Sequence, residues 1–176
     1  MTHRTLIRSA SLLTLSLALT ACVTPAAPVK APVDTTTPAQ RMAAVDAVAA
    51  GADEKELAIQ PLRDAEIEDL RMTAQARRQA NDLAGAADAL NQALLISEGD
   101  PSILQERAEI ALLQGDWGRA ETLARKAVEL GSKTGPLCRR HWATIEQSRL
   151  ARGEKENAVS AHAQLEGCTV PGIKRY

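Results

Sequence analysis

Residues 86–96 read AADALNQALLI, and residues 120–130, which lie 34 positions further on, read AETLARKAVEL. Apolar residues spaced by three and four lie on one face of a helix, and self-similarity at a fixed period predicts a repeat architecture. Small side chains on such a face let two helices approach closely. The two segments share these small or aliphatic positions, which are Ala86, Leu90 and Ala93 in the first and Ala120, Ala124 and Ala127 in the second.

The period extends to both sides of these segments. Leu70 aligns with Leu104 at the same shift, and a third copy follows at a shift of 38, where Ala120 aligns with Ala158. We expect the four extra residues in the loop 131–137, because loop insertions cost little free energy. A helix pair cannot bury its apolar face alone, so about three stacked pairs are the minimum for stability. The predicted copies span residues 67–100, 101–134 and 135–168.

The turn sequences Gly115-Asp116 and Gly153-Glu154, with the ladder of small residues after each turn, resemble the tetratricopeptide repeat. This family repeats two antiparallel helices every 34 residues. The third ladder would be Ala158, His162 and Leu165, and Trp142 is the one first-helix aromatic residue in place. The resemblance implies an all-α fold, a short solenoid of about three antiparallel helix pairs over residues 61–168.

Composition excludes several functions. The chain has 176 residues, a formal net charge of −1, two Trp, one Tyr and no Phe, so it lacks a basic surface and a stacking platform for nucleic acid. The sequence contains no serine elbow, no glycine-rich phosphate loop and no HExxH motif. We therefore expect no nucleic-acid partner, no cofactor, no metal and no enzymatic activity.

The N-terminus has the pattern of a signal peptide. Residues 1–21 carry Arg4 and Arg8 before the apolar stretch 9–20, which is too short to span a bilayer. The sequence Leu19-Thr20-Ala21-Cys22 resembles the lipobox of bacterial lipoprotein precursors. The resemblance implies removal of residues 1–21, acylation of Cys22 and, because Val23 follows, an outer-membrane anchor with the folded part in the periplasm. An ordinary secretory signal is the alternative. The mature chain would have a net charge of −3.

Two segments separate the anchor from the repeats. Residues 22–38 form the lipidated cysteine and a proline-rich tether that leans towards polyproline conformation. Residues 39–60 contain Met42, Val45 and Val48 at a spacing of three, which indicates a short helix. We expect this segment to be weakly structured or to form an N-terminal cap. The tail 169–176 is too short for a capping helix, so the last pair would leave an apolar end for a partner or a second copy.

Two cysteines remain besides Cys22. In the export context that the lipobox implies, an even pair indicates a disulfide, here Cys138 with Cys168 across the ends of the third helix pair. Zinc bound by these two cysteines with His141 and His162 is an alternative, as are free thiols. The zinc site would require His162, six residues before Cys168 and so roughly 9 Å from it along a helix, to converge with the other three.

Tetratricopeptide arrays bind protein segments along a face lined by the first helix of each pair. We hypothesise an adaptor or scaffold in an envelope complex, similar to pilotins, outer-membrane assembly factors or wall-hydrolase adaptors. A self-associating structural lipoprotein, such as a homodimer, is the alternative. The implied partner-binding groove would consist of Arg71, Gln75 and Arg78 in the first copy, Gln105, Glu109 and Leu112 in the second, and Ala143, Gln147 and Leu150 in the third.

Overall fold

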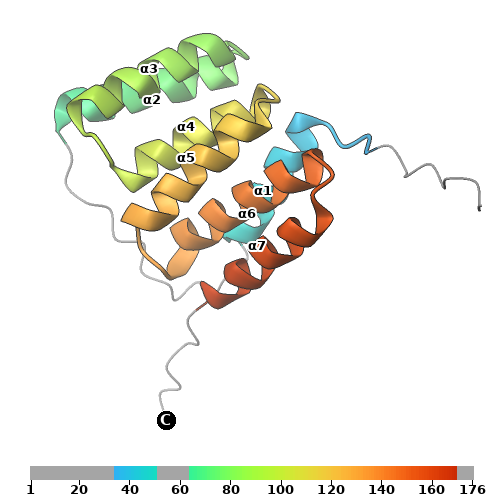
Figure 1. Ribbon diagram of the computed structural model, residues 1–176. Coiled ribbons are helices and arrows are strands. Elements are labelled where there is room, and N and C mark those ends of the chain that lie inside the picture. Colours follow the sequence, from blue (N-terminus) through green and yellow to red (C-terminus); the bar gives the residue numbers. More distant parts are fainter. Residues whose placement is uncertain (1–33, 51–63, 170–176) are drawn as a thin grey trace, which may run out of the picture. The chain divides into compact units, whose positions relative to one another are not determined.

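Six helices form three antiparallel pairs that follow one another along the chain (Figure 1). The computed structural model describes residues 34–50 and 64–169, which contain seven helices and no strand. The all-α, tetratricopeptide-like fold predicted from the sequence is thus confirmed. The pairs are α2 (Ala65–Gln79) with α3 (Leu83–Ile96), α4 (Pro101–Leu113) with α5 (Trp117–Leu130), and α6 (Gly135–Ala151) with α7 (Lys155–Gly167).

Each pair turns through three residues, and the middle one has a positive φ angle. This residue is Asn81 (φ 59°), Gly115 (φ 76°) or Gly153 (φ 76°), and glycine and asparagine adopt the left-handed conformation most readily. An aspartate then caps the second helix in the first two pairs, because Asp82 and Asp116 each accept a hydrogen bond from a backbone N–H three residues on. The periodic turn therefore fixes where each helix ends and the next begins.

The alanine ladder packs the second helix of each pair against the first. Ala86, Ala93, Ala120, Ala124 and Ala127 have no exposed surface. In the third pair the ladder differs from the prediction.

The position predicted for His162 is taken by Ala161, which is fully buried, while the His162 side chain is 52% exposed. A buried imidazole would need a partner for each polar nitrogen, whereas an alanine at this place needs none.

The four extra residues of the third copy lie in a helix rather than in the loop where we expected them. α6 has 17 residues and α4 has 13, whereas the connections 97–100 and 131–134 are equally long. Four residues are close to one helical turn of 3.6 residues, so the insertion lengthens α6 and keeps its buried face in register.

The N-terminal helix α1 (Pro38–Ala50) packs against α6 and α4. Its direction is opposite to that of α6, because Arg41 near its start contacts Gln147 late in α6, and Val48 near its end contacts Arg139 early in α6. The helix therefore lies on the second and third pairs. Within the described segments, no helix has the length and apolar character needed to cross a membrane.

Candidate functional site

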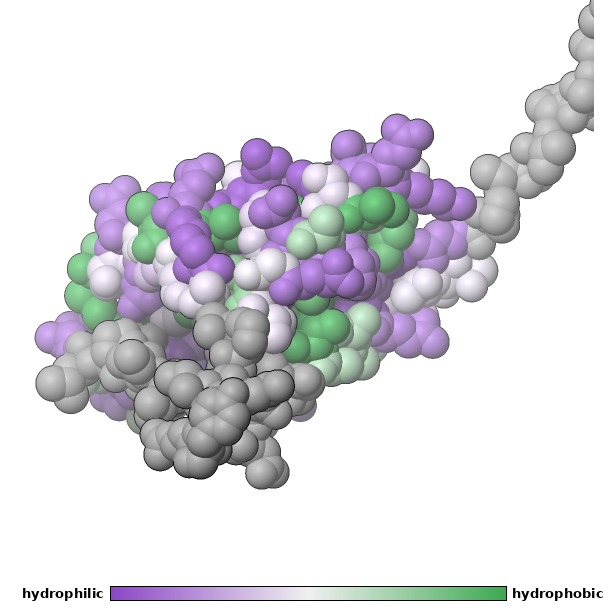
Figure 2. All heavy atoms as spheres, turned by 90° about the horizontal axis from the view of Figure 1, so that it is seen from below, coloured by the Kyte–Doolittle hydropathy of each residue, from purple (hydrophilic) through white to green (hydrophobic). Residues whose placement is uncertain are grey.

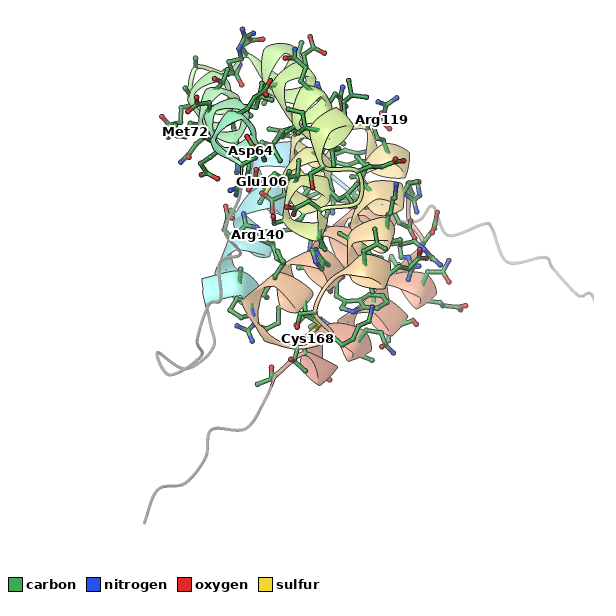
Figure 3. The ribbon with its side chains drawn as sticks, turned by 90° about the vertical axis from the view of Figure 1, so that its left-hand side faces the viewer. Asp64, Met72, Glu106, Arg119, Arg140 and Cys168 are labelled. Carbon is green, nitrogen blue, oxygen red and sulfur yellow. A yellow bond between two sulfur atoms is a disulfide. The ribbon has the colours of Figure 1, made fainter. Side chains whose placement is uncertain are left out.

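The first helices α2, α4 and α6 line the side of the fold on which we expected a binding groove. We call this side the first-helix face. Figure 3 shows it on the left, where Met72 lies on the outer side of α2 and Glu106 and Arg140 lie below it, towards the N-terminal helix α1. The structure divides this face into a covered part under α1 and an open part beside α2.

The covered part contains the predicted groove residues of the third copy and one of the second. Leu112 and Ala143 are buried in one apolar cluster with Met42 and Val45 of α1. Gln147 accepts hydrogen bonds from Arg41, and Leu150 is half-buried. The sequence predicted a groove along the first helices of all three pairs. In the structure the apolar side chains of α1 cover the second half of this groove, so it is not open along its whole length.

Polar contacts fix both ends of α1 on this face. Arg41 Nη1 donates to the backbone and side-chain oxygens of Gln147 at 3.3 Å, and Arg139 Nε donates to the Val48 carbonyl at 3.2 Å. The Arg41 guanidinium also lies 5.7 Å from the ring centroid of Trp117. The regular spacing of Met42, Val45 and Val48 was the sequence signal for this packing, but it did not reveal the surface that α1 covers.

The open part is a cavity of about 610 Å³ between α2, α4 and the start of α6. Its apolar wall includes Met72, which is 54% exposed, together with Ile110 and Leu137. The remaining predicted groove residues line it, although Gln105 and Glu109 lie in its floor and are only 1% and 2% exposed. The predicted residues that line this cavity are Arg71, Gln75, Arg78, Gln105 and Glu109.

Ion pairs cross the cavity from helix to helix. Arg71 of α2 pairs with Glu106 of α4, and this hydrogen-bonded contact raises the pKa of Arg71. Glu109 is held between Arg78 of α2, at 3.3 Å, and Arg140 of α6. The sequence analysis did not single out Glu106 or Arg140, because no pattern within one helix shows which charges meet across helices.

Arg140 joins the open part to the covered part. Its guanidinium contacts Glu109 and also lies 2.6 Å from a carboxylate oxygen of Asp46 on α1. Burial opposes the charge of Arg140, but the hydrogen bonds and charges of Glu109 and Asp46 together raise its pKa. The guanidinium therefore stays charged and holds α1 against the floor of the cavity.

A chain of hydrogen bonds lies beneath the cavity floor. The Gln105 amide nitrogen donates to Glu109 at 3.0 Å and to Thr144 Oγ1 at 2.8 Å, so its oxygen is left to accept from His141 Nδ1 at 2.7 Å. This arrangement places the proton of a neutral His141 on Nδ1. Burial, followed by the positive charges of Lys133 and Arg140, lowers the pKa of His141 to about 4.

A disulfide closes the third helix pair. The Sγ atoms of Cys138 and Cys168 are bonded, their Cα atoms are 5.7 Å apart, and the Gly135 N–H donates to the Cys168 carbonyl at 2.8 Å. The four residues of the zinc hypothesis do not converge, because His141 is buried against Gln105 while His162 is exposed beside Glu146. Cys22, the predicted lipidation site, lies outside the described residues.

A comparison with solved structures finds a protein domain with a similar fold. No protein-family model matches the chain, and no curated protein matches it. The fold is similar to the globular C-terminal domain of LpoP from P. aeruginosa, with a TM-score of 0.57 and 28% sequence identity. The match covers 60% of this chain and 99% of the LpoP domain. That share of the chain is about equal to the share taken by the three helix pairs, residues 64–169.

Proposed function

We propose that the chain is a lipid-anchored periplasmic adaptor that binds a segment of an envelope protein in the open part of its first-helix face. The observation that carries the proposal is the cavity of about 610 Å³ between α2, α4 and α6. The chain shares both its fold and 28% of its aligned residues with the LpoP domain, and this likeness supports an envelope role. The tetratricopeptide resemblance supports the choice of this face, because that family binds protein segments there.

The lining of the cavity supports a protein segment as the ligand. Met72 and Leu137 offer apolar surface, and the ion pair between Arg71 and Glu106 lies at the side. A mixture of aliphatic and charged groups suits an amphipathic helix or an extended segment. The charged groups of the cavity pair with one another, which supports a binding role over a catalytic one.

Anchoring through Cys22 is the second element of the proposal. It follows from the lipobox resemblance, and the proline-rich tether 22–38 would hold the folded part away from the outer membrane. Several acyl chains give stable membrane binding, whereas one chain alone is marginal. Labelled palmitate should appear in the wild-type chain and disappear in Cys22→Ser. Labelling that persists in Cys22→Ser would remove the anchor from the proposal.

The binding face can be tested by photo-crosslinking in cells. A photoreactive amino acid at Met72, which is exposed in the cavity, should capture an envelope protein. The matched control carries the same amino acid at Ala163, an exposed position of α7 outside the cavity lining. Capture at position 72 alone supports the proposal, and equal capture at both positions, or none at position 72, contradicts it.

A second copy of the chain is the alternative partner, and exposed apolar residues favour it. Leu95 and Ile96 at the end of α3 are 85% and 45% exposed, and Leu130 at the end of α5 is 53% exposed. On the face in Figure 2, hydrophobic residues are interspersed among polar ones. Light scattering after size exclusion separates the two hypotheses, because a monomer at all concentrations removes the self-associating lipoprotein.

A further inference from the structure

A hollow of about 360 Å³ lies between α3, α4 and α5 and takes no part in the proposed adaptor site. Its lining is Asn91, Arg107, Arg119, Thr122 and Leu123. In Figure 3, Arg119 lies on the opposite side of the fold from Met72, so the hollow and the first-helix face point in different directions. A ligand in the hollow therefore would not compete with one in the cavity.

Arg107 is the unusual member of this lining. The residue is only 4% exposed, its Nε donates to Asn91 Oδ1 at 3.0 Å, and its Nη1 is buried without a hydrogen-bond partner. In the described part of the chain no carboxylate lies within salt-bridge distance of it. A buried cation that lacks an anion is costly, so its presence calls for an explanation.

Two other arginines of the described segments show the usual solution, which is an anion beside the guanidinium. The buried Arg41 pairs with Asp34. Arg140, which is half-buried, has two carboxylate partners. Among the described residues, Arg107 has the neutral oxygen of Asn91 as its only hydrogen-bond partner, although its planar guanidinium suits two parallel hydrogen bonds to one carboxylate.

The charges around the hollow favour an anion with a single charge. Arg119 adds a second positive charge, but Asp116 lies 3.2 Å from it. Burial and the repulsion from Arg119 lower the pKa of Arg107, while Asp116 and Asp88 act in the opposite direction. The two arginines and the two nearby aspartates sum to a formal charge of zero, and both aspartates would repel a doubly charged phosphate more strongly than a singly charged carboxylate.

We propose that the hollow formed by Arg107, Arg119 and Asn91 binds the carboxylate of an acidic side chain from a protein partner. Arg107 supplies the N–H groups of Nη1 from the floor of the hollow, while its Nε–H stays bonded to Asn91, and Arg119 approaches the carboxylate from the rim. The exposed Arg119 side chain can do so by leaving its pairing with Asp116, since a surface ion pair of this kind is worth little. The chain would then have two independent contact sites on opposite sides of the fold.

NMR titration of the folded protein tests this site directly. The probes are the acetylated and amidated peptides Gly-Gly-Glu-Gly-Gly and Gly-Gly-Gln-Gly-Gly, with inorganic phosphate as a third probe at the same ionic strength. The Nε–Hε signal of Arg107 should shift and saturate with the glutamate peptide alone. A response that is equal for both peptides, or absent for both, or tighter for phosphate than for the glutamate peptide, would overturn the proposal.

Matched variants assign the binding to these arginines. Arg107→Met should reduce affinity for the glutamate peptide at least tenfold, read from the backbone signals of α5, without lowering Tm. Arg125→Met, which changes an exposed α5 arginine that pairs with Glu121, is the control and should leave affinity unchanged. If Arg107→Met does not fold, Arg119→Met replaces it, with an expected loss of about threefold. Full affinity in Arg107→Met, or in its replacement, would contradict the assignment.

Discussion

The two parts of the first-helix face are built from equivalent positions of the repeat, yet one is covered and the other open. In the covered part, Leu112 and Ala143 receive the apolar side chains Met42 and Val45. In the open part, charges on α2 and α4 pair with each other across the cavity instead. The difference teaches that the position of a residue in the repeat does not decide its accessibility, because a segment outside the repeat can cover it.

The two parts also differ in how firmly their helices are held. The covered part rests on α6, which the disulfide joins to α7, while one wall of the open part is α2, whose packing on α3 is noncovalent. Glu109 and Arg140 lie at the boundary and touch both parts. Changes at the disulfide, at the boundary and on either side of it should therefore have graded effects.

Removal of the disulfide should have the largest effect. The double variant Cys138→Ala, Cys168→Ala removes the link between two residues that are 30 positions apart. On the chain-entropy model, this loss lowers the unfolding free energy by about 4 kcal/mol. Urea unfolding followed by circular dichroism measures the change. Because α1 packs on α6, its amides should also exchange faster with solvent than those of α2. Equal stability of the oxidised and reduced chains would show that noncovalent packing alone holds this part.

Loss of the boundary carboxylate should come next. Glu109→Gln leaves Arg78 without its carboxylate partner and Arg140 with Asp46 alone, and breaking such a buried pair costs about 3 kcal/mol. The control is Glu106→Gln, whose side chain is 32% exposed and whose loss should cost less than about 1 kcal/mol. Urea unfolding of both variants gives the comparison. Similar costs for both would mean that burial at the boundary does not matter.

Acid should weaken the fold through His141. Its pKa is lowered from 6.5 to about 4 in the folded state, so below pH 6.5 the unfolded chain binds a proton that the folded chain does not. The stabilisation is complete above pH 6.5 and is lost as the pH falls towards 4, with a total of about 3 kcal/mol.

Unfolding free energies measured between pH 7.5 and 4.5 give the slope for His141. His141→Asn should flatten it, whereas His162→Gln, a change at an exposed position, should retain it. A slope that persists in His141→Asn would assign the acid sensitivity to other groups.

The sequence was enough to predict the helix pairs, because their signals are local and periodic. The ladder of alanines and the turns at Asn81, Gly115 and Gly153 recur at nearly equal spacing, so the pair boundaries could be predicted from them. The third ladder was harder to place. His162 and Ala161 are adjacent, and only the packing of α7 shows which of them faces α6.

The candidate site was less predictable, because it depends on contacts between distant segments. Arg71, Gln75 and Arg78 were expected on the open face and lie there. The apolar cluster that contains both Val45 and Ala143 joins positions almost 100 residues apart, and the ion pairs of Glu109 connect three helices. Spacing along one helix carries no information about such contacts, since helix packing decides them.

The substitutions with the smallest expected effects compare the covered part with the open part most directly. Val45 has no exposed surface under α1, so Val45→Ala should cost about 2 kcal/mol of unfolding free energy from lost apolar burial and the cavity left behind. Met72 projects into the open cavity and is 54% exposed, so Met72→Ala should change stability by less than about 0.5 kcal/mol. Ligand binding should show the reverse order, with Met72→Ala weakening capture of the partner and Val45→Ala leaving it intact. If Val45→Ala were neutral for stability, α1 would be a loosely held cover and the two parts would be one continuous groove.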